Sequence, residues 1–283
     1  MIFSETDKLL KKETRWDTFM AKNLPGVYTA TKKDGTTYYR ASLTYRNKHI
    51  SLGSYDTAVI ANQAYLEALE LLTNTSLLID NYSSSKTLKF EKWVSLINFR
   101  DNGLYLANPI YIRPKFFYYY LSPSDVYTFD SDDLFYYSSH KIMKRGGHLF
   151  VSDYGMQTNI QNRYGIKSYA VCGKDFIFIN GNDHDYRYEN IEIINRYNGV
   201  TKIYKQNMPF YQAKIHINGD YLIGTYETEN EAAIAYNKAI DVLKKAGCNK
   251  NYTPNFLDLP SSQYVLIYNI LPINQKLYTL TFP

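Results

Sequence analysis

Two stretches of this 283-residue chain repeat each other. Residues 26–72 and 199–243 both begin with Gly-Val, and they align without a gap from Gly53 and Gly224 onward. Identical residues face each other in the two copies at Gly53, Tyr55, Thr57, Ala61, Ala64, Tyr65 and Ala68. Chance similarity between two helical stretches would not also match the glycines and the turns, so we interpret the pair as two copies of one module.

Each copy predicts a small antiparallel sheet. Residues 39–45 alternate between apolar or tyrosine positions and polar positions, and residues 211–217 do the same. Alternation with one apolar face is typical of a half-buried strand. A third strand follows with Ile50 and Leu52 inward, and Asn218-Gly219 predicts a hairpin turn in the second copy.

A helix is predicted after each sheet. Thr57 and Thr228 are the expected N-caps, and Thr228 with Glu231 fits a capping box. Apolar residues recur on one helical face over residues 61–72 and 232–243, and Gly247 is expected to end the second helix. The sequence therefore predicts an α+β fold, in which each module is a three-stranded antiparallel sheet with one packed helix.

One helix covers only one face of such a sheet, so the other face is either a solvated surface or a binding platform. The side chains expected on the uncovered faces are Arg40, Ser42, Thr44, Arg46 and His49 in the first copy and Gln212, Lys214 and His216 in the second. The flanking lysines are Lys32, Lys33, Lys202 and Lys205. Strands can read the major groove of DNA, where Arg or Lys suits guanine and Gln suits adenine.

Both copies resemble the ethylene-response-factor (Apetala-two) DNA-binding domain, and more closely its prokaryotic relatives. The resemblance is carried by the Gly-Val start, the Tyr-x-Ala-x-Leu/Ile strand, the Leu/Ile-Gly-x-Tyr turn and the helix ending Ala-Tyr-x-x-Ala. It implies that the uncovered faces lie in the major groove of double-stranded DNA. Ser51 and Leu222 depart from the family, which has a large aromatic there, and Asp220 adds a negative charge, so no base preference is carried over.

The segment between the copies resembles an HNH nuclease. Its matches to the second half of that motif are Asn180, Gly181, Asn182, Asp185, Arg187, Asn190 and Ile191. HNH chemistry needs a histidine to take a proton from water and ligands for a divalent cation. Phe178 stands at the histidine position, Ile177 at the preceding Asp position and Asn162 at an upstream histidine position. The resemblance thus implies a ββα-containing nuclease scaffold that has lost its reaction, with no catalytic residue, no metal and no cofactor.

The expected organisation has five parts. They are a first module over 24–74, a linker or connector over 75–104, the degenerate HNH-like domain over 105–198, a second module over 199–247 and a C-terminal extension over 248–283. Residues 75–88 are rich in Asn, Ser and Thr, which is typical of a linker.

Composition narrows the class of protein. With 45% apolar and 21% charged residues the chain is not a disordered one, and a net charge of +5 permits nucleic-acid binding without arguing for it. Cys172 and Cys248 are the only cysteines, which excludes a thiolate zinc site and favours a reducing compartment. Residues 1–12 do not resemble a signal peptide, and no apolar run is long enough to span a membrane. We expect an intracellular protein of the cytoplasm or nucleoid.

Three functions remain open from the sequence. The favoured one is non-catalytic double-stranded DNA binding by a transcription regulator or a domesticated mobile-element protein. The second is an HNH-type homing or nicking endonuclease in which His184, His140 or His148 acts as a displaced catalytic group. The third is a structural or partner-binding protein that has lost DNA binding; the 30 tyrosines leave this reading open.

Overall fold

The computed structural model of the chain describes residues 24–282. These form small antiparallel sheets and helices, which confirms the α+β class. The chain divides into two compact units, the first ending at Met143 and the second beginning at Lys144. This division lies inside residues 105–198, which were expected to form one domain. The expected lack of a signal peptide concerns residues 1–12, which lie outside the described residues.

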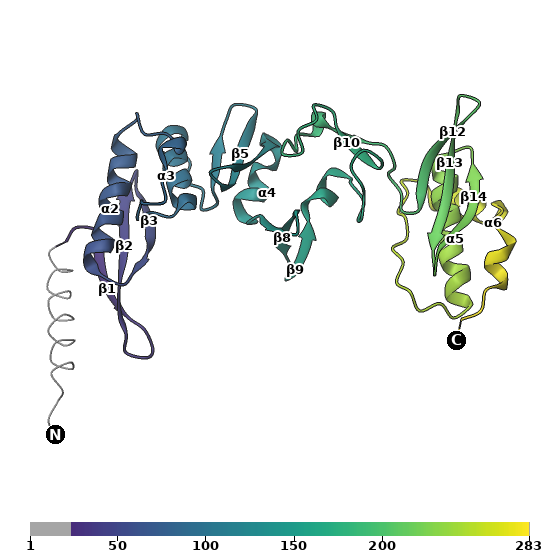
Figure 1. Cartoon of the computed structure of the whole chain (residues 1–283), viewed down its shortest axis with the longest axis horizontal. Coiled ribbons are helices and arrows are strands. Elements are labelled where there is room, and N and C mark those ends of the chain that lie inside the picture. Colours follow the sequence, from purple (N-terminus) through teal and green to yellow (C-terminus); the bar gives the residue numbers. More distant parts are fainter. Residues whose placement is uncertain (1–23, 283) are drawn as a thin grey trace, which may run out of the picture. The chain divides into compact units, whose positions relative to one another are not determined.

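The first module is built as predicted. Strands β1 (Val27–Thr31), β2 (Thr37–Tyr45) and β3 (Lys48–Tyr55) form an antiparallel sheet in that order, and helix α2 (Ala58–Thr73) packs on one face (Figure 1). Thr57 caps the helix, because its hydroxyl accepts from the N–H of Ile60 at 3.3 Å. Ala61 and Ala64 are fully buried, and their small side chains let the helix lie close to the sheet.

The second module repeats this arrangement. Strands β12 (Val200–Lys205), β13 (Met208–His216) and β14 (Asp220–Tyr226) form the sheet, and α5 (Glu229–Lys245) packs on one face. The predicted capping box is confirmed: the Glu231 N–H donates to the Thr228 hydroxyl at 3.2 Å, and the Thr228 N–H donates to the Glu231 carboxylate at 3.1 Å. Gly247 follows the helix with a φ of +91°.

A β-bulge stands at the same place in both sheets. It falls between Ala41 and Ser42 in the first and between Ala213 and Lys214 in the second. The opposing glycine of each sheet lies under the ring of the tyrosine two residues later; a Cβ at Gly224 would lie 2.4 Å from the Tyr226 hydroxyl. This contact between the glycine and the tyrosine explains why both copies contain Gly-x-Tyr.

The expected linker over 75–104 is wrong for its second half. After a 3-10 turn at Ile79–Asn81, residues Phe90–Asn102 form helix α3, which packs against α2 and against the next sheet. Trp93 is only 1% exposed and, with Leu96 and Ile97, belongs to the core of the first module. The Asn- and Ser-rich stretch before it obscures an apolar helix that begins at Phe90.

The first unit contains a second sheet. It consists of β4 (Ile110–Ile112), β5 (Phe116–Ser122) and β6 (Asp125–Asp130), followed by a 3-10 turn at Ser131–Asp133 and helix α4 (Leu134–Ser139). Phe117, Phe129 and Tyr137 form a buried ring cluster. The hydroxyl of Tyr119 accepts from the Ile142 N–H at 2.9 Å, and burial raises the pKa of this tyrosine.

The nuclease-like segment differs from the expected ββα arrangement. Strands β7 (Met143–Arg145), β8 (His148–Asp153) and β9 (Met156–Asn159) form one sheet, and a 3-10 turn follows at Ile160–Tyr164. Strands β10 (Phe176–Phe178) and β11 (Ile191–Ile193) form a hairpin whose loop ends in a 3-10 turn at Tyr188–Asn190. Strand β12 of the second module comes next along the chain, so no α-helix lies between the hairpin and that module.

The C-terminal extension packs onto the second module. Helix α6 (Ser261–Ile270) lies against α5, and a 3-10 turn follows at Gln275–Thr279. Leu271 and Leu277 are buried in the core of this module, and the Lys238 ammonium donates to the carbonyls of Tyr268 and Leu271, both at 2.8 Å. None of the helices in residues 24–282 has the length and apolar character needed to cross a membrane.

Candidate nucleic-acid interface

The uncovered face of the first module centres on Arg40. Arg40 stands opposite Tyr28 on β1 and Ser54 on β3. Its guanidinium donates to the Tyr38 hydroxyl at 2.7 Å and lies 5.4 Å from the centre of the Tyr38 ring. Strands β1 to β3 contain no carboxylate. This face therefore presents one positioned guanidinium among tyrosine rings.

Thr44 and His49 lie on the same face, opposite each other on β2 and β3, and both are exposed. Their placement agrees with the predicted alternation. They add a hydroxyl and an imidazole to the donors and acceptors around Arg40.

Of the two other residues predicted on this face, Ser42 is on it, opposite Ser51, but is hardly accessible, and Arg46 is not on it. Ser42 is only 7% exposed, and its N–H donates to the Gly26 carbonyl at 3.0 Å beside the bulge. Arg46 follows the end of β2 in a turn with a φ of +46°, and its guanidinium donates to the Phe99 carbonyl at 3.2 Å. The left-handed turn ends the period of two, which is why alternation alone misplaced Arg46.

Lys32 and Lys33 are exposed in the turn between β1 and β2, at one end of the sheet. The turn is held by the Thr36 N–H, which donates to the Asp34 carboxylate at 2.9 Å. That backbone hydrogen bond lowers the pKa of Asp34, so a negative charge stands beside the two lysines.

The second module presents a different face. Gln212, Lys214 and His216 follow one another on β13, with Lys214 and His216 exposed and Gln212 half-buried. His216 is opposite Asp220, and its Nδ1 lies 2.8 Å from the carboxylate; this hydrogen bond lowers the pKa of Asp220. Leu222 stands opposite Lys214 and is 42% exposed. The second face is thus more apolar than the first and carries an acid.

The two lysines of β12 lie differently. Lys202 is opposite Tyr211, which packs against the core, and its ammonium lies 5.6 Å from the ring centre of Tyr204. It is therefore not on the uncovered face. Lys205 ends the strand, and its ammonium lies 5.6 Å from the ring centre of Phe210. Phe210 is two residues before Gln212 on β13 and so lies on the uncovered face.

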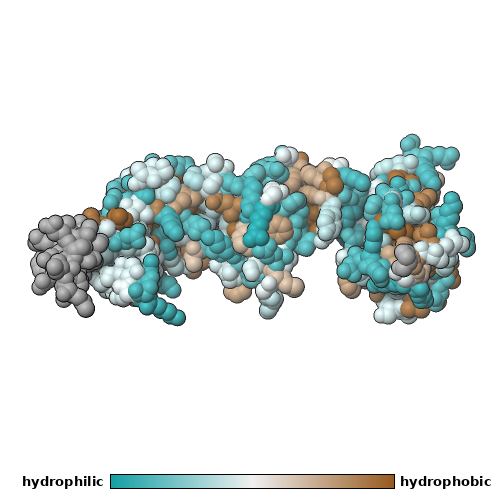
Figure 2. All heavy atoms as spheres, turned by 60° about the horizontal axis from the view of Figure 1, so that its bottom comes forward, coloured by the Kyte–Doolittle hydropathy of each residue, from teal (hydrophilic) through white to brown (hydrophobic). Residues whose placement is uncertain are grey.

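Sequence reasoning missed the aromatic residues of both faces. Tyr38 and Phe210 each stand two positions before a predicted face residue, Arg40 and Gln212. Extending the alternation back by one step would have found them. Other apolar side chains also reach the surface in separate patches, visible in brown in Figure 2.

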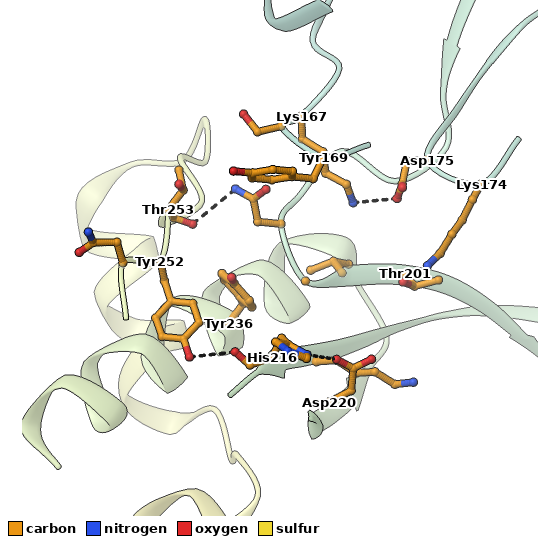
Figure 3. Close-up of a pocket in the computed structure, with 16 residues that line it drawn as sticks. Lys167, Tyr169, Lys174, Asp175, Thr201, His216, Asp220, Tyr236, Tyr252 and Thr253 are labelled. Atoms are coloured by element: carbon orange, nitrogen blue, oxygen red, sulfur yellow. Dashed lines mark hydrogen bonds and ion pairs between the residues drawn. The ribbon is translucent and has the colours of Figure 1, made fainter. Parts of the chain in front are cut away.

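A cavity of about 390 Å³ lies at the edge of the second face. Its walls come from the loop over residues 167–175, from the ends of the strands of the second module and from residues 251–253 (Figure 3). The Tyr252 hydroxyl donates to the His216 carbonyl at 3.0 Å and so closes one side.

Phe178, at the position of the nuclease histidine, is packed among aromatic rings. It is 9% exposed, and its ring centre lies 5.5 Å from those of Phe176 and Tyr186. Ile177 is on the same strand, and Asn162 lies in the 3-10 turn before it. Within residues 24–282, no group of three or more His, Cys, Asp or Glu side chains is placed to hold a metal ion.

The matched Asn and Arg residues build the loop of the hairpin. Asp185 is buried and accepts two hydrogen bonds from the Arg187 guanidinium, at 2.9 and 2.7 Å, one from the Arg187 N–H at 3.3 Å and one from the Asn180 amide at 2.9 Å. Burial alone would raise the pKa of Asp185, but these bonds outweigh it and lower the pKa. The Asn190 amide donates to the Asp185 carbonyl at 2.8 Å.

The histidines considered as displaced catalytic groups are scattered. His184 is in the hairpin loop, with its Nδ1 2.6 Å from the Asp183 carboxylate. His140 follows α4 and stacks on Tyr136 with ring centres 4.2 Å apart, and His148 begins β8. His140 belongs to the first unit and the other two to the second.

Comparisons with protein-family models, with curated proteins and with solved structures gave no match for this chain. A function therefore has to be inferred from the residues and contacts described above.

Proposed function

We propose that this chain binds double-stranded DNA without cutting it, through the uncovered sheet faces of its two modules. The observation that carries the proposal is that each sheet has its helix on one side only. The other side presents groups suited to base edges: Arg40, Thr44 and His49 in the first module, and Gln212, Lys214 and His216 in the second.

The first face is the stronger candidate for reading bases. The Tyr38 hydroxyl accepts from Arg40 at 2.7 Å, and this bond favours one orientation of the guanidinium before any ligand arrives. A fixed guanidinium matches the paired acceptors of guanine, and preorganisation lowers the entropy lost on binding. Lys32 and Lys33 at the end of the sheet supply phosphate contacts that position it.

The second face adds Gln212 and Lys214, residue types that suit adenine and guanine. The carboxylate of Asp220 makes the electrostatic potential of this face less positive than that of the first. The exposed Leu222 offers no hydrogen-bonding group to a base. Two modules on one chain raise avidity when the spacing of their sites lets both engage.

The absence of cutting is inferred from Phe178. A phenyl ring cannot accept the proton of an attacking water, and this one is packed between Phe176 and Tyr186. The hydrogen bonds around Asp185 support a loop whose polar groups serve its own fold.

The test is selection of bound fragments from random duplex DNA by the full chain, followed by gel retardation at several salt concentrations. We expect retarded duplex with affinity that falls steeply as salt rises. Arg40→Ala combined with Lys214→Ala should weaken specific binding by about 2–5 kcal/mol, since each good base contact is worth about 1–3 kcal/mol. A matched control is Arg113→Ala combined with Lys245→Ala, which removes the same charges from exposed sites outside the two uncovered faces, in the turn between β4 and β5 and in the last turn of α5.

Three results would count against the proposal. Binding unchanged by the double substitution would exclude the proposed faces. Strand scission by the purified chain with Mg²⁺ or Mn²⁺ would favour the endonuclease instead. If the chain captured a protein partner and showed no affinity for duplex DNA, a partner-binding role would be favoured.

A further inference from the structure

The cavity at the edge of the second module is bounded by residues from two parts of the second unit. The loop over residues 167–175 supplies Lys174, and strands β13 and β14 supply Lys214, His216 and Asp220 (Figure 3). The last three belong to the uncovered face of the second module. The loop therefore continues that face beyond the sheet.

The loop is fixed to the module by Asn195, which is buried. The Asn195 amide donates to the Lys174 carbonyl at 2.7 Å, and its side-chain oxygen accepts from the Lys202 N–H of β12 at 2.7 Å. One side chain thus joins the backbone that carries Lys174 to the edge strand of the sheet. The position of Lys174 beside the face is set by these bonds.

Both carboxylates of the cavity already have partners. Asp175 forms an ion pair with Lys167 at 2.9 Å. Burial alone would raise the pKa of Asp175, but the hydrogen bonds from Lys167 and from the Val171 N–H lower it. Asp220 is bonded to His216.

The two other lysines of the cavity have no such partner. Within residues 24–282, no carboxylate forms an ion pair with Lys174 or Lys214. Both lysines line the same cavity as Asp220, and after the hydrogen bond from His216 both contribute to lowering the pKa of that carboxyl. Figure 3 shows Lys174 extending along the sheet toward Thr201.

Tyr169 lies in the wall on the loop side. It is fully exposed and has a φ of +63°, a conformation that is uncommon for a bulky residue. Such conformations persist where the surrounding structure holds them, and they are frequent at ligand clamps. An exposed ring in the wall of the same cavity as two lysines suits a sugar or base next to a bound phosphate.

We propose that this cavity is a phosphate subsite, which takes a backbone phosphodiester of the DNA bound by the second module between Lys174 and Lys214. The subsite presupposes the DNA binding proposed above and extends its footprint from the sheet to the loop over residues 167–175. Two ammonium groups suit phosphate oxygens from any source, so a free phosphate ligand is the alternative source that the experiment has to separate.

The first experiment measures the affinity of the full chain for duplex DNA as a function of salt, for wild type, Lys174→Ala and Lys245→Ala. Loss of one phosphate contact should lower the magnitude of the slope of log K against log salt by about 0.9. Lys174→Ala should show this change. Lys245→Ala removes the same charge from the last turn of α5, on the helix side of the sheet, and should leave the slope unchanged.

A second variant, Asp220→Asn, removes the negative charge that faces both lysines. It should tighten duplex binding several-fold at low salt, a gain that partial unfolding cannot produce. Asp220 is exposed and in contact with solvent, so the change is mild for the fold.

The outcomes separate the two proposals. A wild-type chain that binds duplex, with an unchanged slope in Lys174→Ala and unchanged affinity in Asp220→Asn, overturns the subsite and leaves the sheet faces standing. A wild-type chain without duplex affinity overturns both. In that case, the melting temperatures of wild type and Lys174→Ala are measured as inorganic phosphate is added. A rise in wild type with no rise in Lys174→Ala would identify a free phosphate as the ligand.

Discussion

Gly26 lies directly beneath the aromatic ring of Tyr65. A Cβ built at Gly26 would stand 2.0 Å from Cδ2 of that ring, and Gly26 has a φ of +74°. Gly199 and Tyr236 repeat the relationship in the second module, with a Cβ only 2.3 Å from the ring and a φ of +70°. The Gly-Val start and the Ala-Tyr step of each copy are thus the two sides of one contact between the first strand and the helix.

Gly26→Ala should therefore destabilise the first unit. The left-handed backbone costs an alanine about 1–2 kcal/mol, and overpacking against Tyr65 adds about 1–3 kcal/mol. Urea unfolding followed by the fluorescence of Trp93, in a Trp16→Phe background that makes it the sole tryptophan, measures this loss because Trp93 lies in the core of the first unit.

Gly35→Ala is the matched control. Gly35 has a φ of +86°, but a Cβ there would meet nothing within 4 Å, so only the backbone cost applies. Equal losses in the two variants would show that the ring contact contributes nothing.

Arg100 should be a second determinant of the first unit. It is buried, and its guanidinium donates to the carbonyls of Leu71, Asn74 and Leu77 at 3.0, 2.8 and 2.9 Å, where helix α2 ends. All three carbonyls accept from Nη1, while Nε and Nη2 donate to the Asp101 carboxylate at 2.6 and 3.2 Å. A lysine ammonium cannot make both sets of bonds, so Arg100→Lys should cost about 2 kcal/mol in the same unfolding experiment.

The control for this change is Arg113→Lys. Arg113 is exposed, and the same substitution there should change stability by less than about 0.5 kcal/mol. A loss in Arg100→Lys no larger than that in Arg113→Lys would contradict the role of the carbonyl contacts.

The modules were predictable because their signals are local. Alternation, the capping threonines and the alanine face are each read within a few residues of one another, and the structure has them as expected. Helix α3 was missed because its apolar residues face two directions, toward α2 and toward the sheet β4–β6, so they do not form one stripe. The Asn-, Ser- and Thr-rich stretch before it added a misleading linker signal.

The candidate faces were predictable in part for a similar reason. Alternation placed Arg40, Ser42, Thr44, Lys214 and His216 on the uncovered faces correctly, because the bulges put their extra residues on β3 and β14 and leave the period of two intact in β2 and β13. It failed at Arg46, where a left-handed turn changes the direction of the side chain, and it did not reveal that Ser42 is only 7% exposed. The cavity beside Lys174 depends on a contact through Asn195 that no local pattern reveals.

The hairpin loop of the second unit should respond to acid through Asp185. The folded-state pKa of this carboxyl lies below its unfolded value of about 3.9, so its contribution is fully present above about pH 4 and is lost as pH falls through the folded-state pKa. Asp185→Asn should cost about 1.5–3 kcal/mol at pH 7, because hydrogen bonds to a charged group are lost, and the difference from wild type should shrink at pH 3.

Calorimetric unfolding at the two pH values measures this, with Asp183→Asn as the exposed neighbour for comparison. A difference between wild type and Asp185→Asn that stays the same at pH 3 and pH 7 would exclude the charged form as the source of the stability.

Arg46 and Arg40 should separate folding from DNA binding. Arg46 donates to the Phe99 carbonyl from the turn after β2, whereas Arg40 stands on the uncovered face beside Tyr38. Arg46→Ala should therefore lower the stability of the first unit by about 1 kcal/mol and leave the affinity for duplex unchanged once the fraction folded is taken into account. Arg40→Ala should do the reverse, with little effect on unfolding and a loss of about 1–3 kcal/mol in specific binding. Urea unfolding and gel retardation on the same preparations of the two variants measure both quantities. An equal loss of DNA affinity in the two variants would show that Arg46 also contacts the duplex and that the face extends to the turn.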